Sequence, residues 1–376
     1  MMKQDENAKE RKAFKDWFDA SAVRRLSDQF ASATDQFDRK KFSRLAKSGL
    51  EDLEFHGRVK HLSNALRETL PSHVPGALKI LTDSLPEKQP DCDSVTDGWL
   101  QWPLGQWIAD HGVHHYDESM AAMVELTKRF SSEFAVRPFV EKYPDRIFSH
   151  LLDLADDPNP HVRRWCSEGI RTRLPWGKKL HFLIEDPSPI LPILERLKDD
   201  DELYVRRSLA NNLNDIAKDH PELVAGICSQ WTKGAGDERI RLIKHALRSL
   251  VKDGHPGGLL VLGFSPPHRV SATMEVEPAA VSIGGSVTLR ATIRNDSKKR
   301  IAMIVDYAVH YVRKGDKTSD KVFKWKTVEL AAGEEITLKK KHSLKATTIR
   351  ALYPGCHRVD LQINGVRLAE AEFELR

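Results

Sequence analysis

A helical segment that recurs along the middle of the chain constrains the fold more than any other feature. The segments HVRRWCSEGI, YVRRSLANNL and RIRLIKHAL, which begin at His161, Tyr204 and Arg239, can be aligned residue by residue. They follow one another at intervals of about 40 residues, and prolines mark the turns between helices. Such a period with two helices per unit is typical of HEAT-like repeats. Because one unit cannot bury its apolar face alone, we expect the units to stack and line a concave surface.

The first of these segments carries a polar stripe. Its spacing predicts one helix over 161–176, ended by Pro175, which lacks a backbone N–H and disfavours helix at the preceding residue. Arg164, Glu168 and Arg171 are separated by three or four residues and therefore share a face of that helix. Trp176 follows directly, so we expect an indole beside an acid that is flanked by arginines.

The second segment repeats this stripe one unit later. Arg207, Asn211 and Asp215 step by four residues and share a face, and Arg207 aligns with Arg164 while Asn211 aligns with Glu168. Two neighbouring units are therefore predicted to present polar stripes to one groove.

The residue types in this groove favour phosphate binding and the stabilisation of a cation. The guanidinium group binds oxyanions through two parallel hydrogen bonds, so we predict DNA-binding residues at Arg163, Arg164, Arg171, Arg173, Arg206, Arg207 and Asn211. Acids among them would repel DNA, but they would stabilise a sugar that gains oxocarbenium character as an N-glycosidic bond breaks. An indole face would also attract a cationic alkylated base, by about 0.5–2 kcal/mol.

The last hundred residues have a different pattern. Apolar and polar residues alternate in short runs, and Asn364-Gly365 between two such runs is a strong hairpin signal. This pattern predicts an immunoglobulin-like β-sandwich. The expected organisation is a mostly α chain in three segments: a HEAT-like α-α superhelical solenoid over 1–255, a Gly- and Pro-rich linker over 256–270, and the β-sandwich over 271–376.

Composition sets limits on partners and location. The chain has 376 residues and a formal net charge of +5, which permits a nucleic-acid partner without requiring one. The widely spaced cysteines (Cys92, Cys166, Cys228 and Cys356) predict neither a disulfide framework nor a cysteine-rich metal site. Residues 1–12 lack an apolar signal segment, and no run approaches the ~18 apolar residues of a membrane span. We therefore expect a cytoplasmic protein.

Three segments of the helical part resemble a known protein family. The segments HVRRWCSEGIRTRLPWG, YVRRSLANNLNDIAKDHPE and SEFAVRPF resemble the AlkC/AlkD family of HEAT-like DNA glycosylases, which remove alkylated purines. The resemblance covers about residues 1–255 and is closer to the AlkC branch, whose pattern includes the glutamate of the SEG motif and, in some members, a C-terminal Ig-like domain. It implies these roles: acidic site residues at Glu133, Glu168 and Asp215, an aromatic contact to lesion or sugar at Trp176, and phosphate contacts at Arg164 and Arg171.

The resemblance implies an enzyme of base excision repair. We expect a glycosylase that excises cationic N-alkylated bases, 3-methyladenine above all, from duplex DNA and leaves an abasic site. The resemblance also implies that it acts without flipping the base. We expect a monomer near the bacterial nucleoid that uses no metal or cofactor. No general acid is needed, because the leaving base is already cationic.

Other interpretations of the same residues stay open. Acid and arginine three or four residues apart on a helix most often form weak surface salt bridges. Trp99, Trp102 and Trp107 are assigned to packing between helices, and His114 and His115 to the surface. The alternative functions are a DNA-structure-binding protein without activity and a protein-interaction scaffold, the general use of HEAT repeats.

Overall fold

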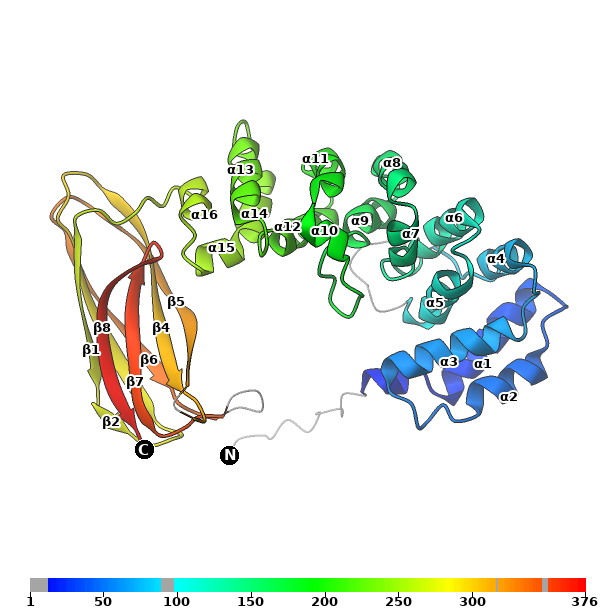
Figure 1. The fold of residues 1–376 in the computed structure, drawn as a ribbon, viewed down its shortest axis with the longest axis horizontal. Coiled ribbons are helices and arrows are strands. Elements are labelled where there is room, and N and C mark those ends of the chain that lie inside the picture. The colour runs from blue at the N-terminus through cyan, green and yellow to red at the C-terminus, as the bar shows by residue number, and fades with distance from the viewer. Residues whose placement is uncertain (1–12, 89–97, 316, 347–350) are drawn as a thin grey trace, which may run out of the picture. The chain divides into compact units, whose positions relative to one another are not determined.

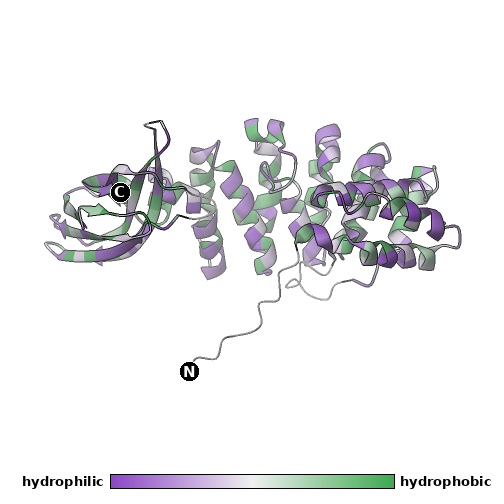
Figure 2. Ribbon diagram, turned by 90° about the horizontal axis from the view of Figure 1, so that it is seen from below, coloured by the Kyte–Doolittle hydropathy of each residue, from purple (hydrophilic) through white to green (hydrophobic). Residues whose placement is uncertain are grey.

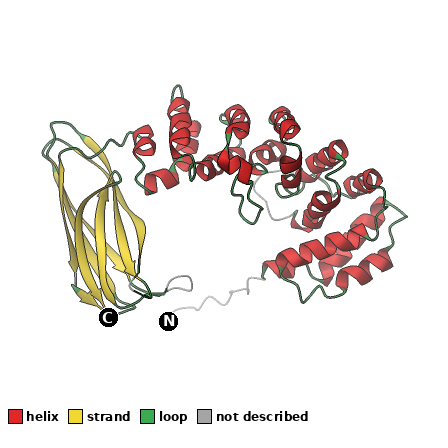
Figure 3. Ribbon diagram, in the orientation of Figure 1, coloured by secondary structure: helices red, strands yellow, loops and turns green. Residues whose placement is uncertain are grey.

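The computed structural model describes residues 13–88, 98–315, 317–346 and 351–376 (Figure 1). A helical part comes first and strands follow from Val270 onward (Figure 3). This confirms the predicted fold class, a HEAT-like helical solenoid followed by an Ig-like β-sandwich. By internal contacts the chain forms two compact units, Met1–Asp215 and Ile216–Arg376, so the division falls inside the helical part.

The first unit consists of helices joined by short turns. Its α-helices are α1 (Ala20–Ala33), α2 (Arg39–Lys47), α3 (Phe55–Arg67), α4 (Val74–Asp83), α5 (Trp102–His111), α6 (Tyr116–Thr127), α7 (Arg137–Lys142), α8 (Pro144–Leu154), α9 (Pro160–Glu168), α10 (His181–Glu185), α11 (Leu191–Leu197) and α12 (Leu203–Ile216). Short 3-10 helices add η1 (Phe14–Trp17), η2 (Trp99–Gln101) and η3 (Ser188–Ile190).

The aligned segments occupy equivalent helices, as the repeat predicts. Val162 on α9 and Val205 on α12 are both fully buried, and Trp165 fills the core beside Val162. Helices α8 and α9 begin at Pro144 and Pro160, where proline is favoured because its missing N–H would have no helical partner. Figure 2 shows apolar and polar residues alternating around the helices, as expected where one face packs inward.

The helix predicted over 161–176 is shorter than expected. Helix α9 ends at Glu168, and Gly169 begins a loop that reaches Leu180. Arg171 is therefore not on the helix; its backbone and side chain are held by tertiary contacts described below. The prediction that Pro175 ends the helix was wrong, because these contacts act seven residues earlier and outweigh local helix propensity.

The second unit begins with helices α13 (Pro221–Trp231), α14 (Asp237–Ala246), α15 (Arg248–Lys252) and α16 (Pro256–Val261). Helix α16 lies inside the segment expected to be a linker and packs against α13. The strands are β1 (Val270–Glu277), β2 (Ala280–Val281), β3 (Ser286–Asn295), β4 (Ile301–Val312), β5 (Thr318–Leu330), β6 (Glu335–Ser343), β7 (Gly355–Ile363) and β8 (Val366–Leu375).

These strands form two sheets with one core between them. One sheet has the order β1-β3-β6 and the other β2-β8-β7-β4-β5, and their inner faces contribute residues such as Leu289, Val305 and Leu361. The Asn364-Gly365 hairpin is confirmed: Ile363 pairs with Val366, and both turn residues have positive φ.

Three of the four cysteines lie in the described part of the chain. Cys166, Cys228 and Cys356 are unpaired, whereas Cys92 and the N-terminal segment 1–12 lie outside the described residues. Among the described helices, none has the length and apolar character needed to cross a membrane.

A buried acid in β4 gives a prediction for stability. Burial raises the pKa of Asp306 to about 6, Lys324 partly opposes this, and Oδ1 has no hydrogen-bond partner among the described residues. This folded-state pKa exceeds the ordinary aspartate pKa of 3.8. The stability that the carboxyl contributes is therefore present below pH 4 and is lost as pH rises through 6. Asp306→Asn should therefore raise the free energy of unfolding at pH 7.5 by about 1–2 kcal/mol, after discounting for partial exposure.

Urea denaturation of wild type and Asp306→Asn at pH 7.5 and at pH 4.5 measures this effect. The gain should shrink at the lower pH, where the native carboxyl is already protonated. A destabilised variant at pH 7.5, or a gain that is independent of pH, would contradict the interpretation.

Candidate functional site

Glu168 is the centre of a buried polar network. It is the last residue of α9 and only 5 % exposed. Its Oε1 accepts a hydrogen bond of 2.6 Å from Arg171 and lies 3.3 Å from Nη2 of Arg164, while Oε2 accepts a bond of 2.6 Å from the Ser208 hydroxyl on α12. The carboxylate is thus held from the helix itself, from the following loop and from the next repeat.

Arg164 links Glu168 to a second acid. Its guanidinium forms an ion pair with Glu133, which lies in the turn before α7, and donates a hydrogen bond of 2.9 Å to Ser131. Its Cζ also lies 5.1 Å from the ring centroid of Tyr204 on α12. The partners that the structure gives to Arg164 are therefore carboxylates and a ring, where the sequence predicted a phosphate.

Arg171 links Glu168 to the third acid in the same way. Its Nε and Nη2 lie 2.9 Å and 2.8 Å from Oδ2 of Asp215, near the end of α12. Asp215 is 3 % exposed. The predicted acids of two successive repeats are therefore brought together, and one arginine bridges them.

Arginines compensate the acids of this network. Glu133, Glu168 and Asp215 supply three formal negative charges, and Arg164 and Arg171, which pair with them, supply two positive charges. The buried guanidinium of Arg137 also acts electrostatically on Glu133 and Asp215. Buried charges are costly unless they are paired, so these guanidiniums lower the cost of burying the carboxylates.

Glu168 keeps its charge despite its burial. Burial alone would raise its pKa, but the charges of Arg164 and Arg171 and the hydrogen bond from Ser208 outweigh it and lower the pKa below its ordinary value. Glu168 is therefore ionised at neutral pH, which suits electrostatic stabilisation and excludes it as an acid that donates a proton.

Aromatic rings form the wall beside these acids. Trp176 is 62 % exposed and has a φ of 63°, a left-handed conformation that few large side chains adopt. Its ring lies 5.9 Å from those of Phe14 and Phe55 and 6.4 Å from Trp102, which stacks on Phe134 at 5.0 Å. An exposed indole held by neighbouring rings is available to contact a ligand.

Acids and rings line one cavity of about 340 Å³. Glu133, Arg164 and Glu168 form its polar side, and Trp176 lies on its apolar side. The remaining lining residues are Trp17, Trp99, Trp102, Phe130, Ser131, Phe134, Leu174 and Pro175. The cavity is large enough for a sugar or one planar heterocycle, and its negative charge and aromatic faces favour a cationic one.

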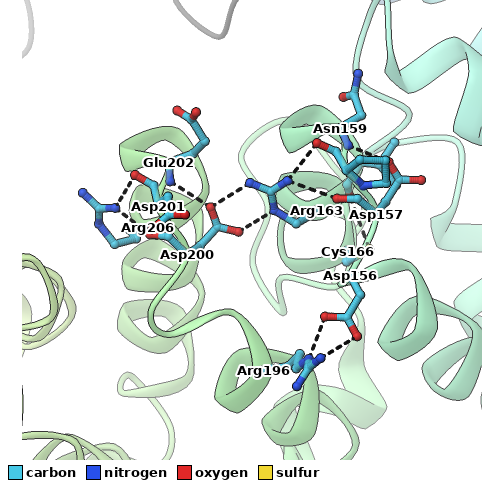
Figure 4. A network of polar contacts seen from close by, with 12 residues as sticks. Asp156, Asp157, Asn159, Arg163, Cys166, Arg196, Asp200, Asp201, Glu202 and Arg206 are labelled. Carbon is cyan, nitrogen blue, oxygen red and sulfur yellow. Dashed lines mark hydrogen bonds and ion pairs between the residues drawn. The ribbon is translucent and has the colours of Figure 1, made fainter.

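Two arginines of the predicted DNA-binding set have other partners (Figure 4). Arg163 forms a bidentate ion pair with Asp200, with distances of 2.6 Å and 3.0 Å. Arg206 is 7 % exposed and donates to the backbone carbonyls of Asp200 and Asp201. The Arg163 pair joins neighbouring repeats, and the Arg206 bonds hold the turn before α12, which accounts for both arginines without a phosphate.

The remaining predicted residues differ in exposure. Arg207 is exposed on α12, and Asn211 and Arg173 are half-buried. Glu168 meets Ser208, one turn before the Asn211 expected from the alignment. Exposure leaves Arg207 the most accessible of the predicted phosphate contacts.

Sequence reasoning missed several residues of the site. Trp99 and Trp102 were assigned to packing between helices, yet both line the cavity, whereas Trp107 is fully buried as expected. Ser208 and Tyr204 were in the aligned segment but received no role. The clustering of three tryptophans within nine residues was the one available signal.

The comparisons with known proteins cover the whole chain. A family model described as the C-terminal Ig-like domain of the uncharacterised protein YhaZ matches residues 270–376. The YhaZ protein of Bacillus subtilis (strain 168), itself described as uncharacterised, is 33% identical over 365 residues, which are 96% of this chain and 99% of that protein.

A solved structure decides the family. The alkylpurine DNA glycosylase AlkC of Pseudomonas fluorescens, bound to DNA that contains an abasic-site analogue, superimposes with a TM-score of 0.86 and 33% identity. The match covers 97% of this chain and 100% of that one. The chain belongs to the AlkC family. Because the AlkC match includes both the helical part and the β-sandwich, it confirms the predicted family resemblance and the order of the two folds.

Proposed function

We propose that the chain is a DNA glycosylase that excises cationic N-alkylated bases, with 3-methyladenine as the main substrate. The observation that carries the proposal is the cavity in which two carboxylates, those of Glu133 and Glu168, lie with one guanidinium, that of Arg164, beside an exposed indole. The AlkC relative, an alkylpurine DNA glycosylase seen with DNA, supports the same reaction class and duplex DNA as the partner.

The proposed reaction is hydrolysis at the anomeric carbon. The bond between C1′ and the base nitrogen breaks, and its electron pair neutralises the cationic base, which leaves without needing a proton. Positive charge then develops on the sugar, where Glu168 and Asp215 stabilise it. Water adds to C1′ and loses a proton to a nearby carboxylate or to solvent, which leaves an abasic site.

Arg164 and Arg171 take a role in this proposal that differs from phosphate binding. Each bridges two carboxylates, so together they hold the acids in one geometry. Preorganised charges of this kind stabilise a transition state without reorganising during the reaction. The open aromatic wall is compatible with a base that stays in the duplex.

Trp176 gives the first test of how a cation is recognised. Trp176→Ala should lower the single-turnover rate on a 3-methyladenine duplex by about 3- to 30-fold, which corresponds to a cation–π contact of about 0.5–2 kcal/mol. Trp176→Phe should retain part of that rate. Both replacements leave an L-residue at the same positive φ, so the backbone strain is matched. Full activity of the alanine variant would remove Trp176 from the site.

The function itself is tested with methylated duplex DNA. The purified full-length protein should release free 3-methyladenine, identified by chromatography, and leave alkali-labile abasic sites in equal amount. The same assay detects other methylated bases and so defines the range of lesions. Absence of any released base, at protein concentrations that saturate the DNA, would reject the glycosylase.

The hydrogen bonds of Glu168 are also compatible with a second function, DNA-structure binding without activity. Both carboxylate oxygens of Glu168 already accept hydrogen bonds within the protein, as they could in a protein that does no chemistry. Such a protein would bind DNA with steep salt dependence but release no base, whereas a protein-interaction scaffold would show no salt-dependent DNA binding.

A further inference from the structure

One buried arginine, Arg137, holds both ends of the loop that carries Arg171 and Trp176. Arg137 is the first residue of α7 and only 3 % exposed. Its Nη1 donates to the carbonyl oxygens of Gly169 and Arg171 at 2.9 Å and 3.0 Å, and its Nε donates to that of Lys178 at 2.8 Å. A single planar group thus fixes the loop where it leaves α9 and where it returns.

The chain around this arginine is built for close approach. Gly169 is packed so tightly that an added Cβ would lie 2.6 Å from Cγ1 of Val136, the residue before Arg137. A glycine at this position therefore lets the end of α9 come within hydrogen-bond distance of the guanidinium. Burial lowers the pKa of Arg137 to about 10, which still leaves the group charged at neutral pH.

Two backbone hydrogen bonds lie within the loop. The Leu180 N–H donates to the Thr172 carbonyl at 3.2 Å, and the Gly177 N–H donates to the Leu174 carbonyl at 3.0 Å. Trp176 lies inside both turns, exposed and at positive φ, and rings from outside the loop contact its indole. The position of its backbone relative to the acids depends on how the loop ends are anchored.

We propose that Arg137 is a positioning residue for base excision, which sets the geometry of Arg171 and Trp176 by tying together the two ends of the loop at 169–178. The inference rests on the proposed function for its effect on rate, but the order of the loop can be measured without activity. The carbonyl oxygens of three loop residues are the hydrogen-bond partners that the structure gives to Arg137.

The test uses the full-length protein with Arg137→Met and Arg137→Lys. Hydrogen exchange followed by mass spectrometry should show at least tenfold faster exchange of the Gly177 and Leu180 amides in Arg137→Met, with the rest of the first unit unchanged. Single-turnover excision should fall by about 10- to 100-fold while affinity for a duplex with an abasic-site analogue changes less than threefold. Arg137→Lys should be intermediate, because an ammonium cannot reach both ends of the loop.

Arg129→Met is the matched control. Arg129 also donates to two backbone carbonyls, those of Pro86 and Glu125 at 2.8 Å and 2.9 Å, but it does not contact the loop. This variant should leave loop exchange and excision unchanged. Three results would overturn the proposal: unchanged loop exchange in Arg137→Met, faster loop exchange with full excision, or faster exchange throughout the unit. If wild type releases no base, the proposed function fails, and loop exchange alone still decides whether Arg137 anchors the loop.

Discussion

Glu168→Gln is expected to reduce the rate of base release by about a thousandfold, which corresponds to ~4 kcal/mol of transition-state stabilisation. The substitution keeps the shape of the side chain and removes its charge. The amide oxygen can still accept from Arg171, and the amide nitrogen can donate to the Ser208 hydroxyl, which is free to rotate. The loss should therefore fall on the chemical step, with a stability cost of about 1–3 kcal/mol from the arginine left undercompensated.

The effect on DNA affinity distinguishes a loss of catalysis from a general loss of folding stability. Removing a negative charge from a DNA-binding cavity lowers repulsion, so Glu168→Gln should bind an abasic-site duplex at least as tightly as wild type. Glu125→Gln is the control, because Glu125 also pairs with two cations, Lys128 and Arg129, at 2.6 Å and 2.7 Å, away from the cavity. Equal rate losses in the two variants would mean that Glu168 acts only through stability.

Asp215→Asn is expected to lower the same rate by about a hundredfold or more. Asp215 accepts both contacts from Arg171 through one oxygen, and in the proposed reaction its charge helps to stabilise the developing cation. An asparagine can keep one of these contacts, so Arg171 stays near Glu168 and neutralises it more completely. Single-turnover kinetics on a duplex with one alkylated base measures the change.

Asp156→Asn is the matched control for this substitution. Asp156 forms a bidentate pair with Arg196 at 2.7 Å and 2.8 Å outside the cavity (Figure 4). Its replacement should leave excision unchanged, because a fully exposed ion pair contributes little to stability. If Asp215→Asn retained the wild-type rate, Glu133 and Glu168 would have to account for the site alone.

Part of this site can be predicted from the sequence. Helical periodicity shows which residues share a helix face, and repeat alignment shows which helices are equivalent. Glu168 and Arg164 are one turn apart and do meet, and Asp215 lies on the helix that alignment pairs with α9. The partner of Glu168 on that helix is shifted by one turn, to Ser208, because α9 ends at Glu168 and stacking sets the register between repeats.

The contacts that periodicity does not describe are those between distant segments. Arg163 pairs with Asp200, and Arg137 binds carbonyls of a loop more than thirty positions away. Neither pairing leaves a spacing pattern in the sequence. Trp102 was assigned to packing because large aromatic residues are mostly buried on average, and which of its faces stays open depends on how η1 and α3 pack beside it.

The β-sandwich was predicted more completely than the site, with strands β2 and β5 missed. Alternation identified β1, β3, β4, β6, β7 and β8, and the hairpin signal placed the last turn. Strand β5 was not assigned: it lies at the edge of its sheet and is mostly exposed on both faces, so its lysines and threonines obscure the apolar alternation.

The most direct measurement of the central claim compares base release and DNA binding by wild type, Glu168→Gln and Asp215→Asn on one duplex that carries a single 3-methyladenine. The account predicts rapid release by wild type, release lowered by at least a hundredfold in both variants, and affinity for the duplex undiminished in all three. Release that is equally fast in both variants, or tight binding by wild type with no release, would contradict it.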